Sequence, residues 1–427
     1  MMPPALAQLA SADNPSAARP APERPRLWVV CEEYGVFSQV WIRRQVQRLT
    51  GFDLRVVCRG ADASEHGVDD EPPIDVVPGT AAQEGASRWL HRLAASPSGN
   101  FFRAPRGQAA TLDRMLREHR PDVILAHFGA MALWVLPAAA KHDVPVVAHF
   151  HGLDLSSSLR NRWYRWSLQR CLSRFAAVVV VGSHQRQWML SQGLDPQSVH
   201  LIPCGVPSSW FTPPADGKRR DPDLVVVINA RLVPWKGVDV GLRAFAEAVS
   251  RGHRARLEVI GDGPERDSLE RLSAALGVTD RVSFLGRLAP EAVRERLRAA
   301  DVFVQPSRVG DNGWVEGFGV SISEASACGL AVVATRTGGI PDQVVDGQTG
   351  RLVEPGDVKA TADALCELLG EEERRRAMGR AGRQLMQTHF DTDTMVERLS
   401  RVLACVTERR VRSKPRTDAK PAGDHQA

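Results

Sequence analysis

The sequence lacks two features that would place it among membrane-spanning or disulfide-rich proteins. No apolar run approaches the roughly 18 residues of a membrane-spanning helix; a clear apolar run covers only residues 176–181. The seven cysteines are scattered, odd in number and without Cys-x-x-Cys spacing, so the sequence indicates neither a zinc site nor a disulfide framework. We therefore predict a chain that does not cross a bilayer and that works in a reducing compartment, the cytoplasm.

A strong excess of charge of one sign is also missing. The 427 residues carry a net charge of +5, with most arginines interleaved with acids, so nucleic acid is not the expected partner. Residues 159–175 are an exception, because they contain five arginines, Trp163 and Trp166, and no acid. This composition favours anionic phosphates or a membrane surface, with the protein peripheral on its cytoplasmic face. The alternative is an ordinary packing helix, because apolar residues recur at helical spacing: Tyr164, Leu168, Leu172 and Phe175.

Short β-rich runs alternate with amphipathic stretches through both halves of the chain. This rhythm predicts an α/β fold with two Rossmann-like, doubly wound domains facing each other across a cleft. It fails around residues 203–223, where proline, glycine and charge cluster. The predicted organisation is a disordered lead (1–25), an N-terminal Rossmann-like domain (26–210), a linker (211–223), a C-terminal Rossmann-like domain (224–405) and a disordered tail (406–427).

In such sheets ligands bind beyond the carboxyl ends of strands, so the loops after strands carry the candidate site. Arg231 and Lys236 follow the first strand of the second half and are suited to neutralising a diphosphate. Gly261 follows the next strand, where a missing side chain lets a ligand approach the backbone. Taken alone, these residues are better explained as surface cations and a plain turn.

The segment EGFGVSISEASACG, residues 316–329, strengthens the case for a ligand. A loop with Glu316 leads into a helix that is predicted to begin near Val320 and to stop at Gly329. The free amides at its start suit phosphate oxygens, and Glu324 suits the hydroxyls of a ribose. Glu316 is then placed to accept from a sugar beyond the phosphates. A sugar nucleotide would contact both carboxylates.

Several motifs in the second half of the chain resemble those of a known family. The motifs ARLVPWKGVD, IGDGPERDSLERL, EGFGVSISEASACGLAVVAT and GGIPDQVVDGQTGRLVEPGD are similar, in order and spacing, to those of the family 4 glycosyltransferases, retaining enzymes of the GT-B fold. The resemblance covers most of the second half and is thinner in the first. It implies transfer of a sugar from a nucleotide diphosphate donor to a hydroxyl acceptor, including lipid-linked saccharides, in polysaccharide or glycolipid synthesis.

The resemblance gives individual residues their roles. Arg231 and Lys236 hold the diphosphate, Glu324 the ribose, Glu316 the transferred sugar, and the backbone around Gly286 and Arg287 the base. The donor-binding set is completed by the glycine loop and the helix start: Gly261, Gly317, Phe318, Gly319 and Val320. In the motif HFHGLD, His151 matches the family's active-site histidine near the sugar, so the catalytic set is His151, Arg231, Lys236 and Glu316.

Two other histidines and three departures from the family pattern complete this comparison. His127 and His149 are interpreted as strand-end packing residues, and His127 also as a possible acceptor contact. Gly35 stands where many members have a Gly-Gly loop, Trp235 stands where the family is often charged, and Asp342 replaces a usual glutamate.

No metal and no cofactor are predicted. Asp-x-Asp pairs occur at residues 221–223 and 391–393, but neither follows a strand, so both are interpreted as turn and cap residues. Two alternatives to a transferase stay open from sequence: a sugar-nucleotide epimerase of similar architecture, and a nucleotide-sugar-binding protein without catalysis.

Overall fold

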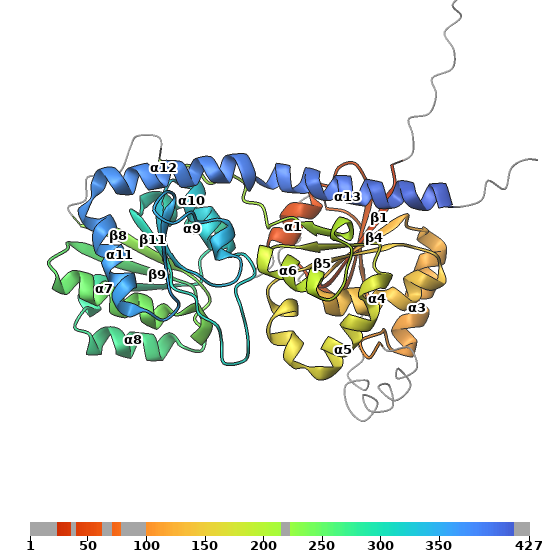
Figure 1. The fold of residues 1–427 in the computed structure, drawn as a ribbon, viewed down its shortest axis with the longest axis horizontal. Helices are drawn as coiled ribbons and strands as arrows, with labels where there is room; N and C mark the ends of the chain where they lie inside the picture. Colours follow the sequence, from red (N-terminus) through yellow and green to blue (C-terminus); the bar gives the residue numbers. More distant parts are fainter. Residues whose placement is uncertain (1–23, 36–39, 62–70, 78–99, 215–222, 414–427) are drawn as a thin grey trace, which may run out of the picture.

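The computed structural model describes residues 24–35, 40–61, 71–77, 100–214 and 223–413. These residues form two α/β domains side by side, each with a parallel sheet between layers of helices (Figure 1). Each sheet buries apolar side chains on both faces, which is why its strands read as continuous apolar runs. The predicted fold class is confirmed.

The first domain has seven strands in the order β3-β2-β1-β4-β5-β6-β7. They are β1 (Arg26–Tyr34), β2 (Asp53–Ala61), β3 (Ile74–Val76), β4 (Val123–His127), β5 (Val146–Phe150), β6 (Ala177–Val180) and β7 (Val199–Leu201). The helices are α1 (Val40–Val46), α3 (Arg106–His119), α4 (Gly129–Lys141), α5 (Arg162–Cys171) and α6 (Ser183–Ser191). The short edge strand β3 is an addition to the strands expected from sequence.

The second domain has six strands in the order β10-β9-β8-β11-β12-β13. They are β8 (Leu224–Asn229), β9 (Ala255–Ile260), β10 (Val282–Gly286), β11 (Val302–Gln305), β12 (Ala331–Thr335) and β13 (Gly350–Val353). The helices are α7 (Val238–Ser250), α8 (Arg266–Ala275), α9 (Pro290–Ala299), α10 (Val320–Ala327), α11 (Val358–Gly370) and α12 (Glu372–His389). The strand order reverses between β8 and β11. The loops after these two strands therefore leave toward opposite faces of the sheet, and a crevice forms at the carboxyl ends of the strands.

Short 3₁₀ helices connect several of these elements. They are η5 (Leu153–Leu155), η6 (Ser157–Arg160), η7 (Leu172–Arg174), η8 (Pro196–Ser198), η9 (Pro234–Lys236), η10 (Thr279–Arg281) and η11 (Ile340–Asp342). Two of them, η5 and η9, lie next to residues of the candidate site.

The last helix, α13 (Thr392–Ser413), corrects the predicted domain limits at residues 405 and 406. It follows α12, which lies along the second domain, and packs on the first domain (Figure 1). Its buried side chains join the core beneath β1, β2 and β4: Met395, Val396, Leu399, Leu403 and Val406. Residues 406–413 are therefore helical and not a disordered tail, while residues 1–23, 215–222 and 414–427 lie outside the described residues.

Asp391 anchors the start of this helix. Its carboxylate accepts from the amide of Asp393 at 2.9 Å and from the Ser208 amide at 3.2 Å. The interpretation of residues 391–393 as a cap is confirmed, because this carboxylate ties the helix start to the chain leaving the first domain. In the other pair Asp221 lies outside the described residues, and Asp223 pairs with Arg254.

The basic segment, residues 159–175, packs as the periodicity predicts, and its arginine side chains are exposed. Tyr164, Leu168 and Leu172 are buried in the core of the first domain, and the side chain of Asn161 caps α5. Trp163 and Trp166 are 36% and 39% exposed on the other side of the helix. Among the described residues, no helix combines the length and apolar character needed to span a membrane.

Candidate active site

Lys236 and Glu316 lie in direct contact where the loops after β8 and β11 converge. The Nζ atom of Lys236 is 2.5 Å from Oε2 of Glu316, and the Ser307 hydroxyl lies 3.4 Å from the same oxygen. The ammonium also sits 4.9 Å from the centre of the Trp314 ring, within range of a cation–π interaction. The Glu316 side chain is only 8% exposed, so this ion pair is shielded from water.

Arg231 stands apart from this pair. Its side chain is exposed, and its guanidinium lies 5.7 Å from the centre of the Trp235 ring. Trp235 in turn lies 5.7 Å from Trp314, centre to centre. The departure from the family pattern at residue 235 thus provides an aromatic link between the loop that carries Arg231 and Lys236 and the loop that carries Glu316.

The helix that was expected to receive phosphates begins as predicted. Gly319 adopts a left-handed conformation with φ of 91° and precedes α10, whose first turn has no side-chain cap and no acidic residue. Gln343 holds the loop from behind, donating from Nε2 to the carbonyl oxygens of Phe318 and Gly319. Gly329 follows the helix with φ of 79°, as the predicted stop requires.

Glu324, one turn into α10, forms an ion pair that the sequence did not reveal. Its Oε1 atom lies 3.1 Å from Nη1 of Arg44, a residue of α1 in the first domain. Burial raises the pKa of the Glu324 carboxyl above its usual value, and the positive charge of Arg44 acts in the opposite direction. Glu316 and Glu324 are therefore held by cations from different domains, and no local motif marked Arg44.

Two glycines of the predicted donor set bring neighbouring loops together. The amide of Gly261 donates to the carbonyl of Gly286 at 2.8 Å, and a Cβ at Gly261 would collide with the carbonyl oxygen of Ala230. The three loops after β8, β9 and β10 are thus in contact. Arg287 lies just beyond, on an exposed part of the same edge.

Gly317 has a different role, because it lies against the first domain. A Cβ on Gly317 would come within 2.7 Å of the backbone of Gly152. Beside this contact, the amide and hydroxyl of Ser183 donate to Asp342 at 2.7 and 2.6 Å. The domains thus touch next to both Glu316 and His151, and Asp342, the third departure from the family pattern, makes part of this contact.

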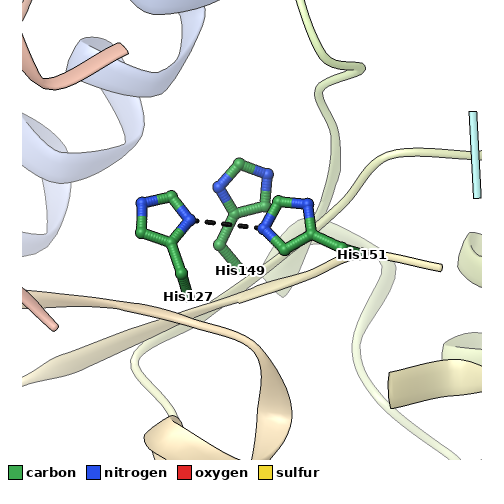
Figure 2. A group of neighbouring side chains, drawn as sticks. All are labelled: His127, His149 and His151. Carbon is green, nitrogen blue, oxygen red and sulfur yellow. Dashed lines mark hydrogen bonds between the residues drawn. The ribbon is translucent and has the colours of Figure 1, made fainter. Parts of the chain in front are cut away.

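His127, His149 and His151 form one buried cluster (Figure 2). His127 and His149 are paired neighbours on β4 and β5, and His151 follows two residues later on the same face. The Nδ1 atom of His127 is 3.3 Å from Nε2 of His151. The interpretation of His127 and His149 as packing residues overlooked this convergence, which the alternation of side chains along paired strands would have signalled.

Burial controls the charge of all three imidazoles. It lowers the pKa of His149 to about 3 and the pKa values of His127 and His151 well below their usual range. The three rings are therefore neutral at pH 7. The Trp41 ring of α1 covers the cluster, with its centre 4.0 Å from that of His151.

Asp154 fixes the loop that carries His151. Its carboxylate accepts from the amide of His151 at 2.8 Å and from the amide of Gly129 at 3.1 Å. Burial raises the pKa of Asp154 to about 7, although these amides act in the opposite direction. Asp154 therefore sets where the backbone turns after β5, and with it the direction of the histidine ring.

Comparisons of the fold agree with this architecture. HepE of Anabaena in complex with UDP has a TM-score of 0.72 at 19% identity, over 89% of this chain and all of that chain. Sucrose-phosphate synthase of Thermosynechococcus elongatus has a TM-score of 0.73 at 20% identity, over 90% of this chain and all of that chain. Together with the two Rossmann-like domains, these neighbours show that the chain has the GT-B fold.

Sequence comparisons then show the family. The model for glycosyl transferases group 1 matches residues 212–385, and the model for glycosyltransferase family 4 matches residues 41–210. The GDP-mannose-dependent alpha-(1-6)-phosphatidylinositol monomannoside mannosyltransferase of Mycolicibacterium smegmatis is 33% identical over 332 residues, 75% of this chain and 86% of the relative. WcaL of Escherichia coli, a putative colanic acid biosynthesis glycosyltransferase, is 29% identical over 282 residues, 65% of this chain and 67% of the relative.

The chain belongs to the family 4 glycosyltransferases and is an enzyme that transfers sugars. The relatives named here are transferases, which favours transfer over the epimerase and the non-catalytic binding protein that the sequence left open.

Proposed function

We propose that this enzyme transfers a hexose, with retention of anomeric configuration, from a nucleotide diphosphate sugar to a hydroxyl of a lipid-linked acceptor. GDP-mannose is the first donor to test, because the relatives in Mycolicibacterium smegmatis and Corynebacterium glutamicum are named as GDP-mannose-dependent. The observation that carries the proposal is the shielded contact between Lys236 and Glu316 beside the start of α10. A cation next to a shielded carboxylate supports binding of a diphosphate and a sugar at this position.

The contact between Lys236 and Glu316 suits a donor that consists of a diphosphate and a sugar. A diphosphate next to α10 attracts the Lys236 ammonium, because a doubly charged leaving group interacts more strongly with a cation than one carboxylate does. Glu316 then turns its oxygens to the hydroxyls of the sugar. Arg231 adds a second cation at the exposed side of the diphosphate. Their charges stabilise the negative charge that grows on the departing phosphate.

Retention is proposed through departure and attack on the same face of the sugar. A nucleophilic carboxylate would have to face the anomeric carbon, whereas Glu316 is proposed to bind the hydroxyls of the sugar. The departing phosphate is then the base that takes the proton of the incoming hydroxyl. His151, held by Asp154, orients the sugar from the first domain, so the protein contributes mainly positioning and electrostatics.

The acceptor side is assigned to the first domain and to a membrane surface. Trp163 and Trp166 are exposed on α5, with Arg162 and Arg170 placed 4.8 and 5.4 Å from their ring centres. Indole rings next to arginines suit the boundary between lipid head groups and acyl chains. Peripheral binding at the cytoplasmic face of a membrane would bring a lipid-linked hydroxyl to the site.

Product analysis tests the proposal. The enzyme is incubated with GDP-mannose or UDP-glucose and with membrane lipid extract, and proton NMR identifies the anomeric configuration of the product. We expect a new glycoside with the configuration of the donor. An inverted product would exclude retention, and an epimerised donor without any glycoside would instead support the epimerase alternative.

A further inference from the structure

The histidine cluster holds more unsatisfied polar atoms than a packing role explains. His127, His149 and His151 are 0%, 2% and 5% exposed. Both ring nitrogens of His149, Nε2 of His127 and Nδ1 of His151 have no hydrogen-bond partner in the described structure. Leaving a buried polar group without a partner costs roughly 1–3 kcal/mol, so His149, which has no partner at either ring nitrogen, points to a ligand at this cluster.

We propose that these three histidines form a binding site for one zinc ion. One potential ligand nitrogen from each ring lies within 4.8 Å of the other two. A tetrahedral ion with zinc–nitrogen bonds of about 2.0–2.1 Å holds its ligand nitrogens about 3.4 Å apart. The 3.3 Å between Nδ1 of His127 and Nε2 of His151 already fits this spacing, and a small movement of the rings brings the third nitrogen in.

The chemistry of the ligands selects the metal. Three imidazoles suit zinc, cobalt, nickel and copper, whereas magnesium and calcium require oxygen ligands. These ions bind imidazole through the lone pair of one ring nitrogen, which each of the three rings can supply. Three protein ligands leave the fourth tetrahedral position open for water or an anion.

A zinc ion here would oppose transfer. It would occupy Nε2 of His151, the residue that the proposed function assigns to the transferred sugar, and this consequence alone rests on that function. We therefore infer an inhibitory site, in which zinc and the sugar donor compete for His151. Zinc binding itself depends only on the three rings, so it is measured without any assay of transfer.

Cobalt is the probe for the site, because tetrahedral cobalt absorbs strongly in the visible range. Full-length protein without a histidine tag is titrated with Co²⁺, and bound zinc is measured separately by equilibrium dialysis. We expect one ion per chain in the wild type and a loss of affinity of at least about tenfold in His127→Phe and in His149→Phe. His253→Phe, a change at a partly exposed histidine in the second domain, serves as the matched control.

The outcomes decide the proposal. No cobalt bound by the wild type, or equal binding by the wild type and both cluster variants, would overturn it. If the phenylalanine variants fail to fold, X-ray absorption on the zinc-loaded wild type decides, because three imidazole ligands support the site and fewer reject it. With binding established, zinc that leaves the transfer rate unchanged would overturn only the inhibitory role.

Discussion

Nη1 of Arg44 lies 3.1 Å from Oε1 of Glu324, which joins α1 of the first domain to α10 of the second. The side chains are 13% and 11% exposed, so this ion pair is largely shielded from water. It also occupies the carboxylate that the family resemblance assigns to the donor ribose. Domain contact and donor binding therefore involve the same residue.

Arg44→Met is expected to destabilise the protein by about 1–3 kcal/mol, because it leaves the Glu324 carboxylate buried without its cation. Arg48→Met is the control, since Arg48 lies just after α1 and pairs with Asp393, whose side chain is 80% exposed. The control should change stability by less than about 1 kcal/mol. Urea denaturation measures the free energy of unfolding of both variants. Equal losses would show that the ion pair of Arg44 stabilises the protein no more than an exposed pair does.

Lys236→Ala is expected to weaken binding of the nucleoside diphosphate about 10- to 100-fold, because a charge-assisted contact to phosphate is lost. Calorimetry with the free nucleotide measures this. Lys359→Ala is the control, since this lysine is on the surface of α11 in the same domain, paired with Asp363. Wild-type affinity in Lys236→Ala would remove Lys236 from the diphosphate site.

His151→Ala is expected to bind the nucleoside diphosphate as the wild type does and to transfer sugar about 100-fold more slowly, because only the orientation of the sugar is lost. A turnover assay beside the calorimetry separates the two effects. A wild-type rate would make His151 purely structural. Loss of nucleotide binding in a folded variant would equally contradict the assigned role.

His149→Phe is expected to change how stability depends on pH. The pKa of His149 is about 3 in the folded protein and 6.5 as its ordinary value, so below pH 6.5 only the unfolded chain takes up this proton. The contribution of His149 to the free energy of unfolding is therefore largest above pH 6.5 and decreases as the pH falls. Phenylalanine removes the proton uptake and should reduce the slope by up to about 1.4 kcal/mol per pH unit. Urea denaturation between about pH 5 and 7 measures the free energy of unfolding of both proteins. If it depends on pH equally in the wild type and in His149→Phe, the burial effect is contradicted.

Transfer is expected to survive chelation by EDTA, because Arg231 and Lys236 supply the positive charge for the departing diphosphate. The proposed zinc site agrees with this, since removing an inhibitory ion does not lower the rate. The transfer rate before and after dialysis against EDTA is the measurement. Complete loss, restored by magnesium or manganese, would show that a metal and not these cations neutralises the leaving group.

Binding to anionic vesicles is expected to depend on α5. The double variant Arg162→Glu and Arg165→Glu should sediment less with vesicles that contain phosphatidylglycerol, because its exposed face becomes acidic. Arg160 is left intact, since it donates to the carbonyl of Asp311 in the second domain. Arg376→Glu with Arg380→Glu applies the same charge change on α12. If both double variants sediment alike, the α5 surface is not the membrane contact.

The sequence by itself determined the features that depend on neighbours along the chain. The buried strands, the alternation with helices, and the limits of α10 between Gly319 and Gly329 follow from local periodicity and from the conformational freedom of glycine. Lys236 and Glu316 were also assigned to one site from the sequence. That assignment came from the family motif, because local periodicity does not relate the two residues.

The tertiary structure alone decided the features that depend on packing between distant segments. The apolar stripe of α13 fits either domain by its spacing, and only the path of the chain places it on the first. Arg44 and Glu324 are 280 positions apart, so the docking of the domains brings them together. His127 and His149 face each other because of the register of β4 against β5. Periodicity tells which face a side chain takes, whereas register and domain docking select its partner.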